Sequence, residues 1–263
     1  MAFLQINYYS KTLKKLVSFN ALMPIDAVEV PGEVPQPKEE MKALYLLHGY
    51  SGNYQDWVSG SNIQELSLKH NLAVFMPSGE NSFYLDDEDK GELFGEFIGR
   101  ELVECTRKLF SLSHRKEDTF IGGLSMGGYG AIRNGLKYSD TFGGVIALSS
   151  ALIIKEISGI AEDHKDEIAD YKYYRRVFGN LSELLGSDKD PEAIVRNLLK
   201  EGKELPRIYM ACGTEDFLLD KNRDYHSFLL SNNVEHTYIE GPGDHNWSFW
   251  NEYIDKGIDW IYK

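Results

Sequence analysis

The pentapeptide Gly123-Leu124-Ser125-Met126-Gly127 joins a segment with the pattern of a buried strand to a segment with the pattern of a helix. Residues 119–122 form the strand-like segment, and residues 126–136 carry apolar side chains at helical spacing. A serine in this setting sits on a sharp turn that exposes its hydroxyl beside the positive end of the helix. The flanking glycines are needed because a Cβ would collide with the neighbouring strand and helix. The sequence therefore predicts a nucleophilic serine where a strand ends.

Strand-like and helix-like segments alternate along most of the chain. The predicted strands are residues 3–10 and 14–22, which read as an antiparallel pair, and then 43–47, 72–76, 119–122, 144–148, 208–211 and 235–239. The predicted helices include residues 94–109, 126–136, 222–230 and 247–262. Such alternation indicates an α/β fold, with a mostly parallel central sheet and helices on both faces.

Residues 151–204 differ from the rest of the chain. They are charged and rich in tyrosine, with two helix-like pieces and no clear strand. We interpret them as a short helical excursion over the active site, a cap-like insertion and not a second domain. Residues 30–40 are rich in proline and charge and predict a solvated loop. We therefore expect residues 1–263 to form a single α/β domain, which suits their length.

Composition excludes several classes of partner. The net charge of −13 argues against nucleic acid and anionic membrane, since phosphate binding needs clustered lysine and arginine, and it favours a neutral or cationic substrate. Cys105 and Cys212 lie in a helix-like and a strand-like segment and are expected to be small buried side chains, not a disulfide. Neither a signal peptide nor a membrane-spanning run is apparent, so a cytoplasmic protein is expected. A homo-oligomer remains open.

A serine hydroxyl becomes an effective nucleophile only with a base, and the base needs an orienting carboxylate. In the fold that carries this elbow, the groups follow in the order serine, acid, histidine. Loops with suitable side chains follow the last two predicted strands: one contains Glu215 and Asp216, and the other contains His245. We assign Ser125 as nucleophile, Asp216 as the carboxylate and His245 as general base and then general acid. Glu215 and Asp220 remain alternatives to Asp216.

Two backbone amides are expected to bind the developing oxyanion. One is the amide of Met126, directly after the nucleophile, and the other is the amide of Tyr50, in the loop that follows strand 43–47. In that loop we expect His48 to have a structural role, fixing the backbone by hydrogen bonds. The candidates for the wall of the substrate pocket are Trp57, Tyr129, Phe217 and Trp247.

The sequence contains no pattern typical of a metal or cofactor site. There is no HExxH motif and no cysteine cluster. The acidic run Asp86-Asp87-Glu88-Asp89 lacks the spacing and the glycine of a calcium-binding loop, and it predicts a solvated turn. We therefore expect neither a metal nor a cofactor, and a small-molecule ester as substrate.

Taken together, the motifs resemble those of a known family. They are Leu46-Leu47-His48-Gly49 with Gly52-Asn53 and Trp57, the elbow extended to Gly130, Cys212-Gly213-Thr214-Glu215-Asp216-Phe217, and His245-Asn246-Trp247 with Trp250. This set looks like the tributyrin esterase branch of the esterase D family, serine esterases of the α/β-hydrolase superfamily. The resemblance covers nearly the whole chain. It implies a carboxylesterase that acts on short acyl esters through an acyl-enzyme, with Ser125, Asp216 and His245 at the triad positions.

Related activities remain as alternatives. S-formylglutathione hydrolases have a similar Ser-Met-Gly-Gly elbow, but their oxyanion strand typically lacks the pair seen here as His48-Gly49. Acetyl esterases and feruloyl (cinnamoyl) esterases that act on carbohydrate esters also share the elbow. A binding protein without activity on the same fold is a more distant alternative, because fold does not fix function.

Overall fold

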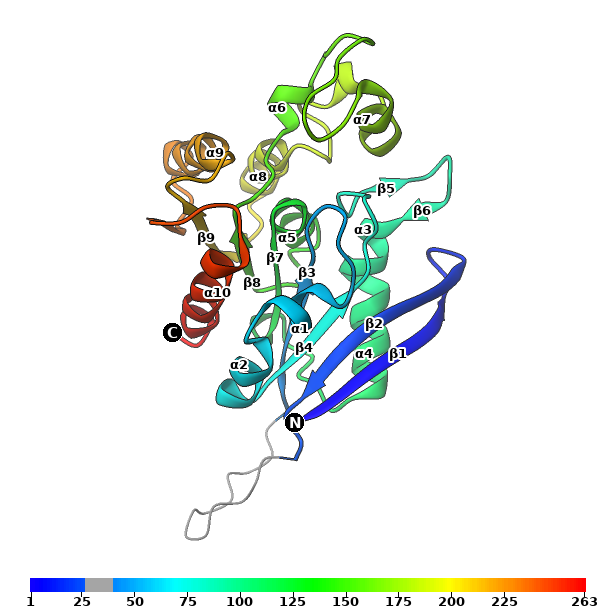
Figure 1. Cartoon of the computed structure of the whole chain (residues 1–263), viewed down its shortest axis with the longest axis vertical. Coiled ribbons are helices and arrows are strands. Elements are labelled where there is room, and N and C mark those ends of the chain that lie inside the picture. The colour runs from blue at the N-terminus through cyan, green and yellow to red at the C-terminus, as the bar shows by residue number, and fades with distance from the viewer. Residues whose placement is uncertain (27–39) are drawn as a thin grey trace.

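Eight strands form the central sheet of the computed structural model, which describes residues 1–26 and 40–263. Across the sheet the strands lie in the order β1-β2-β4-β3-β7-β8-β9-β10 (Figure 1). Their bounds are β1 (Ala2–Ser10), β2 (Lys15–Met23), β3 (Lys42–Leu47), β4 (Leu72–Pro77), β7 (Thr119–Leu124), β8 (Gly144–Leu148), β9 (Arg207–Gly213) and β10 (Thr237–Gly241). Strand β2 pairs antiparallel with β1 and β4, and the strands from β4 to β10 are parallel. The mostly parallel sheet is thus confirmed.

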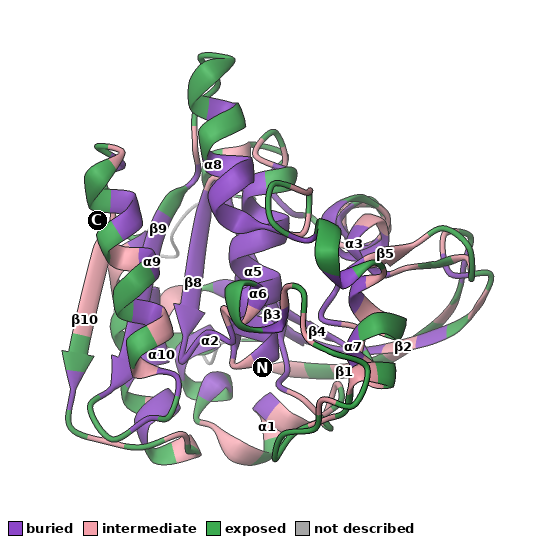
Figure 2. Ribbon diagram, turned by 90° about the horizontal axis from the view of Figure 1, so that it is seen from above, coloured by how far each residue is buried: buried purple, intermediate pink, exposed green. Residues whose placement is uncertain are grey.

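Helices cover both faces of this sheet. The bounds of those that pack beside it are α1 (Asp56–Gly60), α2 (Ile63–His70), α4 (Leu102–Leu109), α5 (Met126–Lys137), α9 (Leu219–Ser231) and α10 (Trp247–Ile261). Alternate residues of β3 divide between two hydrophobic clusters, as the pleat of a strand requires. Tyr45 and Leu47 join α4, α5 and α9 on one face, while Leu44 and Leu46 join α1, α2 and α10 on the other. Figure 2 shows the buried residues concentrated in the sheet and in α5.

The predicted helix over residues 94–109 is built from three pieces. A short helix α3 (Phe94–Glu96) leads into a π-helical turn, η1 (Phe97–Glu101), and then into α4. The predicted apolar face is correct only for its first half, since Cys105 is half-buried and Leu109 is exposed. The π turn inserts an extra residue and rotates the following helix, so that Val103 and Thr106 are buried instead.

Residues 151–204 lie beyond the carboxyl ends of the parallel strands (Figure 1). They form α6 (Ile154–Ile157), α7 (Tyr171–Phe178), a 3-10 turn, η3 (Leu181–Glu183), and α8 (Pro191–Lys200), with one isolated bridge between Lys165 and Asp170. Helix α8 begins at a proline, and the preceding Asp190 caps it by accepting a hydrogen bond from the Glu192 amide. The helical character of this segment agrees with its sequence pattern.

The acidic run at residues 86–89 is not simply a solvated turn. Asp86 and Asp87 form β5 (Asp86–Asp87), which pairs with β6 (Glu92–Leu93), and the side chain of Asp86 is only 15% exposed. Its carboxylate is 3.1 Å from Nζ of Lys137 on α5. The expectation of a fully solvated run is therefore wrong for Asp86, because a cation on a neighbouring helix balances its charge.

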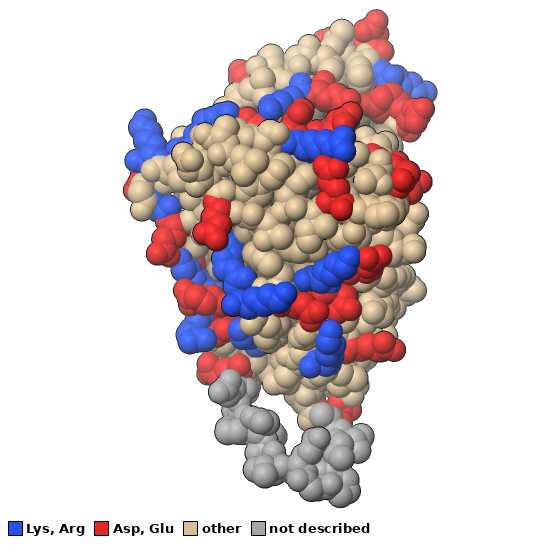
Figure 3. Space-filling model, turned by 90° about the vertical axis from the view of Figure 1, so that its left-hand side faces the viewer, with Lys and Arg blue, Asp and Glu red and all other residues tan. Residues whose placement is uncertain are grey.

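The remaining boundaries differ little from those expected. A 3-10 turn, η2 (Lys116–Asp118), precedes β7, and β10 begins two residues later than the sequence pattern suggested. The loop that we predicted over residues 30–40 lies outside the described residues, except for Glu40. Among the described helices, none combines the length and apolar character that crossing a membrane requires. On the face drawn in Figure 3, basic and acidic side chains are interspersed.

Candidate active site

Ser125 occupies a strained turn between β7 and α5. Its backbone has φ 55° and ψ −120°, in a region that residues other than glycine rarely adopt. Two neighbouring segments hold this conformation: the Ser125 amide donates to the Leu148 carbonyl at 2.9 Å, and the Ser125 carbonyl accepts from the Ala151 amide at 3.0 Å. Strain maintained in this way is typical of a functional residue.

The two glycines of the elbow permit a close approach of α5 to the sheet. A Cβ at Gly123 would lie 2.4 Å from the carbonyl oxygen of Gly127. A Cβ at Gly127 would lie 2.4 Å from the carbonyl oxygen of Leu47, at the end of β3. Since real Cβ atoms do not approach backbone oxygens this closely, the turn requires glycine at both positions, as the sequence pattern predicts.

Asp216 and His245 lie together at the carboxyl end of the sheet. Oδ2 of Asp216 is 2.9 Å from Nδ1 of His245, and Oδ1 accepts a hydrogen bond from the Leu218 amide at 2.9 Å. Burial alone would raise the pKa of the Asp216 carboxyl, but hydrogen bonds from His245, Ser149 and Leu218 outweigh it and hold that pKa below its usual range. The carboxylate is therefore charged at neutral pH and orients the imidazole.

The other two carboxylates considered for this role do not reach the histidine. Glu215 accepts a hydrogen bond from the Gly243 amide at 2.6 Å and is exposed to solvent. Asp220 has a side chain that is 92% exposed, and its nearest cation is Arg223 at 3.7 Å. Of the three candidates, the structure brings Asp216 to His245.

The loop after β3 supplies amides that face the same cavity as Ser125. Tyr50, like Met126, lines this cavity, and within the described residues neither backbone amide has a hydrogen-bond partner. Nε2 of His48 accepts a hydrogen bond from the Gly79 amide at 2.8 Å, which requires that Nε2 carry no proton. Nδ1 of His48 then donates to the Gly49 carbonyl at 2.7 Å. His48 thus fixes the loop, the structural role expected of it.

The cavity has a volume of about 600 Å³ and contains Ser125 and His245 in its wall. Of the four aromatic residues predicted to line it, Phe217 and Trp247 do so. Trp57 is buried below the loop, where Nε1 donates to the Leu47 carbonyl at 2.9 Å. Tyr129 is buried as well, and its hydroxyl donates to the Lys189 carbonyl at 2.6 Å. The expectation is therefore incorrect for Trp57 and Tyr129, which anchor backbone segments in the core.

Several residues in the cavity wall were not anticipated from the sequence. They come from the loop before β5, from residues 151–204 and from α10: Phe83, Ile153, Ile168, Tyr174 and Trp250. Only Trp250 had a visible signal, because it follows Trp247 at helical spacing and shares a helix face with it. The others depend on how distant segments fold over the sheet edge.

The rim of the cavity is predominantly acidic. Four carboxylate side chains line it, those of Asp56, Glu156, Asp166 and Glu167. The single lysine in the wall, Lys221, lies 3.3 Å from Glu156 and is thereby paired. Such a rim favours neutral or cationic substrates over anionic ones.

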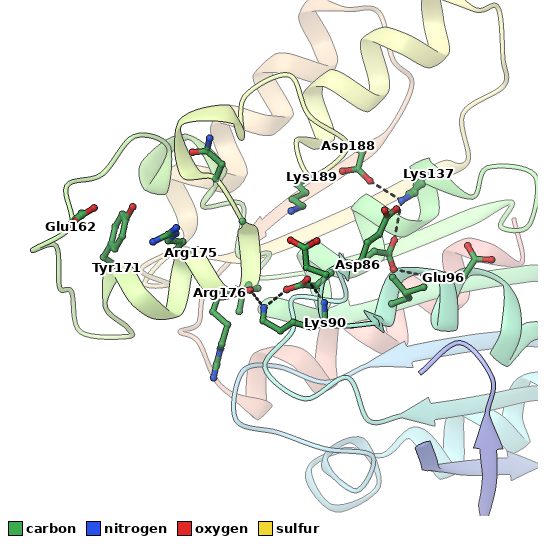
Figure 4. A pocket seen from close by; sticks show the side chains of 17 residues that line it. Asp86, Lys90, Glu96, Lys137, Glu162, Tyr171, Arg175, Arg176, Asp188 and Lys189 are labelled. Carbon is green, nitrogen blue, oxygen red and sulfur yellow. Dashed lines mark hydrogen bonds and ion pairs between the residues drawn. The ribbon is translucent and has the colours of Figure 1, made fainter. Parts of the chain in front are cut away.

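A larger cavity of about 1220 Å³ lies between the β5–β6 hairpin and α7 (Figure 4). Its wall is mostly charged, and many of the charges are paired within the protein. Lys137 bridges Asp86 at 3.1 Å and Asp188 at 2.8 Å, and Lys90 pairs with Asp87. This cavity contains neither Ser125 nor His245, so the smaller cavity is the candidate active site.

One cluster among the described residues has the composition of a metal site. Ligand atoms of His70, Asp255 and Asp259 lie within 4.8 Å of one another. Nζ of Lys69 is 3.1 Å from Asp255 and 3.2 Å from Asp259, so an ammonium group of the chain itself already bridges the two carboxylates. The cluster is part of the packing between α2 and α10 and includes no residue of the candidate active-site cavity.

Comparison with known proteins agrees with this architecture. The model of the Esterase family, described as "Putative esterase", matches residues 27–261. The chain is 54% identical over 263 residues to a protein named Acetyl esterase from Caldicellulosiruptor saccharolyticus, covering 100% of this chain and 99% of that protein.

Two solved structures from Staphylococcus aureus are similar over the full length. FphF, a fluorophosphonate-binding serine hydrolase, has a TM-score of 0.86 and 27% identity, covering 100% of this chain and 98% of its own. The S-formylglutathione hydrolase FrmB has a TM-score of 0.84 and 28% identity, and the match covers 100% of this chain and 99% of the FrmB chain. The chain therefore belongs to the Esterase family and is a carboxylic ester hydrolase with the α/β-hydrolase fold.

Proposed function

We propose that the protein hydrolyses short-chain acyl esters of neutral alcohols through a Ser125–His245–Asp216 triad and an acyl-enzyme intermediate. The observation that carries the proposal is the 2.9 Å contact between Asp216 and His245 beside the same cavity as the strained Ser125. This is the activity that the resemblance to the tributyrin esterase branch implies. Apolar side chains such as Phe83 and Ile153 in the cavity wall suit a short hydrocarbon chain.

The reaction proceeds in two halves. Oγ of Ser125 attacks the ester carbonyl carbon while His245 takes its proton, and the oxyanion accepts hydrogen bonds from the amides of Tyr50 and Met126. The tetrahedral intermediate collapses, the C–O bond to the alcohol breaks, and His245 returns the proton to the leaving oxygen. A water molecule, deprotonated by the same histidine, then attacks the acyl-enzyme and releases the carboxylic acid with free Ser125.

Acetyl esters are the first substrates to test, because the relative at 54% identity is named Acetyl esterase. A second candidate is the thioester activity named for the structural neighbour FrmB. The acidic rim formed by Asp56, Glu156, Asp166 and Glu167 disfavours it, since the glutathione portion carries carboxylates.

The test is a series of p-nitrophenyl esters from acetate to octanoate, with S-formylglutathione and methyl ferulate as competing substrates. We expect kcat/KM to be highest from acetate to butyrate. Ser125→Ala and His245→Ala should each reduce kcat by at least about a thousandfold, because the triad acts as a unit. A dominant rate on either competing substrate would replace the proposed substrate class.

The choice of carboxylate has a matched control. Asp216→Asn should reduce kcat strongly, because the amide no longer stabilises the imidazolium or its tautomer. Glu215→Gln changes the adjacent carboxylate, which does not contact His245, and should leave kcat within about threefold of wild type. Equal losses in the two variants would contradict the assignment of Asp216.

A further inference from the structure

Two consecutive aromatic residues, Phe83 and Tyr84, have strained backbone conformations in the loop between β4 and β5. Their φ angles are 52° and 55°, in the left-handed region that bulky side chains rarely adopt. Glu80 in the same loop also has a positive φ, of 50°. Strain of this kind persists only where the surrounding structure holds it, and it is often found beside functional sites. The loop borders the candidate active-site cavity, to whose wall Phe83 contributes.

Hydrogen bonds from three directions hold Tyr84. Its hydroxyl donates to the His48 carbonyl at 2.9 Å, its amide donates to Oγ of Ser82 at 3.0 Å, and its carbonyl accepts from Nδ2 of Asn134 on α5 at 3.1 Å. Tyr84 is fully buried, and a buried polar group that loses its partner costs free energy, so these bonds resist rearrangement of the loop. The backbone that carries Phe83 is therefore fixed by the residue that follows it.

The ring of Phe83 is also packed from behind. It lies edge-on to the ring of Tyr129 on α5, with centroids 5.6 Å apart, and its centroid is 4.8 Å from that of Phe178 on α7. Phe83 is only 4% exposed, yet it forms part of the cavity wall. Tyr174 lines the cavity as well, and its ring centroid is 6.4 Å from that of Phe178. Phe83 and Tyr174 thus form one aromatic wall, with Phe178 behind both rings.

The proposed mechanism assigns the two sides of the cavity to different parts of the ester. His245 returns a proton to the leaving oxygen, so the alcohol must lie on the histidine side of Ser125. The rings beside His245 are those of Phe217 and of Trp250 on α10, with centroid distances of 4.7 and 5.0 Å. The aromatic wall belongs instead to α7 and the loop before β5, and α10 and α7 lie on opposite sides of α5 (Figures 1 and 2). The acyl chain, directed away from the alcohol, then extends toward Phe83.

We propose that Phe83 is the residue that limits the length of the acyl chain that the enzyme accepts. The inference rests on the proposed function and deepens it, because it assigns the preference for short acyl groups to one side chain. A longer chain would have to displace a ring that Tyr129 and Phe178 hold in place, on a backbone that Tyr84 fixes. Forcing additional methylene groups against such a packed wall is unfavourable, so discrimination should increase with each carbon that reaches the ring.

The test compares the wild type with Phe83→Ala on p-nitrophenyl esters from acetate to octanoate. We expect the ratio of kcat/KM for octanoate to that for butyrate to rise at least about tenfold in the variant, the discrimination that a single methylene group provides in a hydrophobic pocket. This ratio is the decisive readout, because a variant that is merely damaged loses activity on both esters alike. A ratio within about twofold of the wild-type value would overturn the proposal.

A second series of substrates separates the acyl side from the alcohol side. In alkyl acetates from methyl to octyl the acyl group is constant, so Phe83→Ala should leave their relative kcat/KM values unchanged. Phe217→Ala is the matched control, since it removes the same kind of ring from the His245 side. It should alter the alkyl acetate series and leave the octanoate-to-butyrate ratio as in the wild type. The reverse pattern would overturn the assignment of Phe83 to the acyl chain.

A Phe83→Leu variant keeps the proposal testable if the alanine variant does not fold. Leucine retains apolar contact with Phe178 but is smaller than the ring, so the ratio should shift in the same direction by less. Circular dichroism and thermal unfolding show whether each variant is folded. If the wild-type protein shows no Ser125-dependent ester hydrolysis, the proposed function fails. If it cleaves butyrate and the folded Phe83 variants keep its acyl preference, only this inference fails.

Discussion

Individual buried polar side chains hold the candidate active site in shape. His48 is the clearest case, because it is almost fully buried and both ring nitrogens hydrogen-bond to backbone groups around the loop that carries Tyr50. Burial lowers the pKa of His48, and its hydrogen bond to Gly49 and the charge of Asp56 offset this only in part. A proton on Nε2 would displace the Gly79 amide, so the native loop requires the neutral imidazole.

This requirement predicts a pH dependence of stability. The folded-state pKa of His48 lies below its unfolded value of about 6.5, so its contribution is complete above that pH and is lost as the pH falls. Urea unfolding from pH 7.5 to pH 5 should show a falling free energy of unfolding for the wild type. His48→Gln, which does not titrate, should show a shallower slope in that window. Identical slopes would mean that His48 is not held neutral by the fold.

Helix α7 braces the loop that carries Tyr50, although the two are far apart in sequence. The ring of Tyr173 lies edge-on to that of Tyr50, with centroids 5.6 Å apart. The Tyr173 hydroxyl donates to the Asn81 carbonyl at 2.9 Å, and Oδ1 of Asn81 accepts from the Ser51 amide at 2.8 Å. Residues 151–204 therefore do more than border the cavity: through Tyr173 they touch the loop whose Tyr50 amide we assign to the oxyanion.

Removing this brace should affect turnover more than folding. Tyr173→Ala loses both the ring contact with Tyr50 and the hydrogen bond to Asn81. We expect kcat to fall by about tenfold, because the loop whose Tyr50 amide we assign to the oxyanion then loosens. Tyr173→Phe keeps the ring and should lose only part of that activity. Lys172→Ala, an exposed neighbour on the same helix, is the control and should behave as wild type. Equal kcat values in the alanine variants at positions 172 and 173 would argue against the brace.

Across the whole molecule, hydrogen-bonded carboxylates connect elements that are distant in sequence. Glu101 in the π-helical turn accepts hydrogen bonds from Ser10, Lys11 and Thr12, and so ties the β1–β2 turn to the helices beside the sheet. Burial alone would raise the pKa of Glu101, but these hydrogen bonds outweigh it and keep the pKa below its usual range. Burial would also raise the pKa of Asp118. Its interactions with Arg115, Ser113 and Lys42 outweigh this effect and lower that pKa.

The lowered pKa values of Glu101 and Asp118 predict that the folded protein loses stability in acid. A carboxyl whose folded-state pKa is lowered stabilises the protein above its unfolded pKa, about 4, and loses that contribution as the pH falls through the folded value. Chemical denaturation at pH 7, 5, 4 and 3 should show stability lost mainly below pH 4. Glu101→Gln should be less stable than wild type at pH 7, and the difference should shrink at pH 3. A constant difference across that range would exclude the ionised carboxylate as its source.

Much of the fold and of the geometry of the candidate site could be predicted from local patterns. The elbow at Ser125 is a strand, a turn and a helix in sequence, and the requirement for glycine at positions 123 and 127 follows from the close approach that such a turn imposes. The strand order along the chain placed Asp216 and His245 in neighbouring loops at one edge of a parallel sheet. Both inferences succeed because they depend on residues that are adjacent in sequence or on strands that end at one edge.

What the sequence left open depends on side-chain direction and on contacts between distant segments. Asp216, Glu215 and Asp220 lie within six residues of one another, and only the folded loop directs the first of them toward His245. Packing likewise sends Trp57 into the core while Phe217 faces the cavity. The chain thus encodes its candidate nucleophile, its candidate base and its fold class locally. The acid partner, the cavity wall and the support around them exist only once separate elements meet, since burial and hydrogen-bond geometry are properties of the assembled structure.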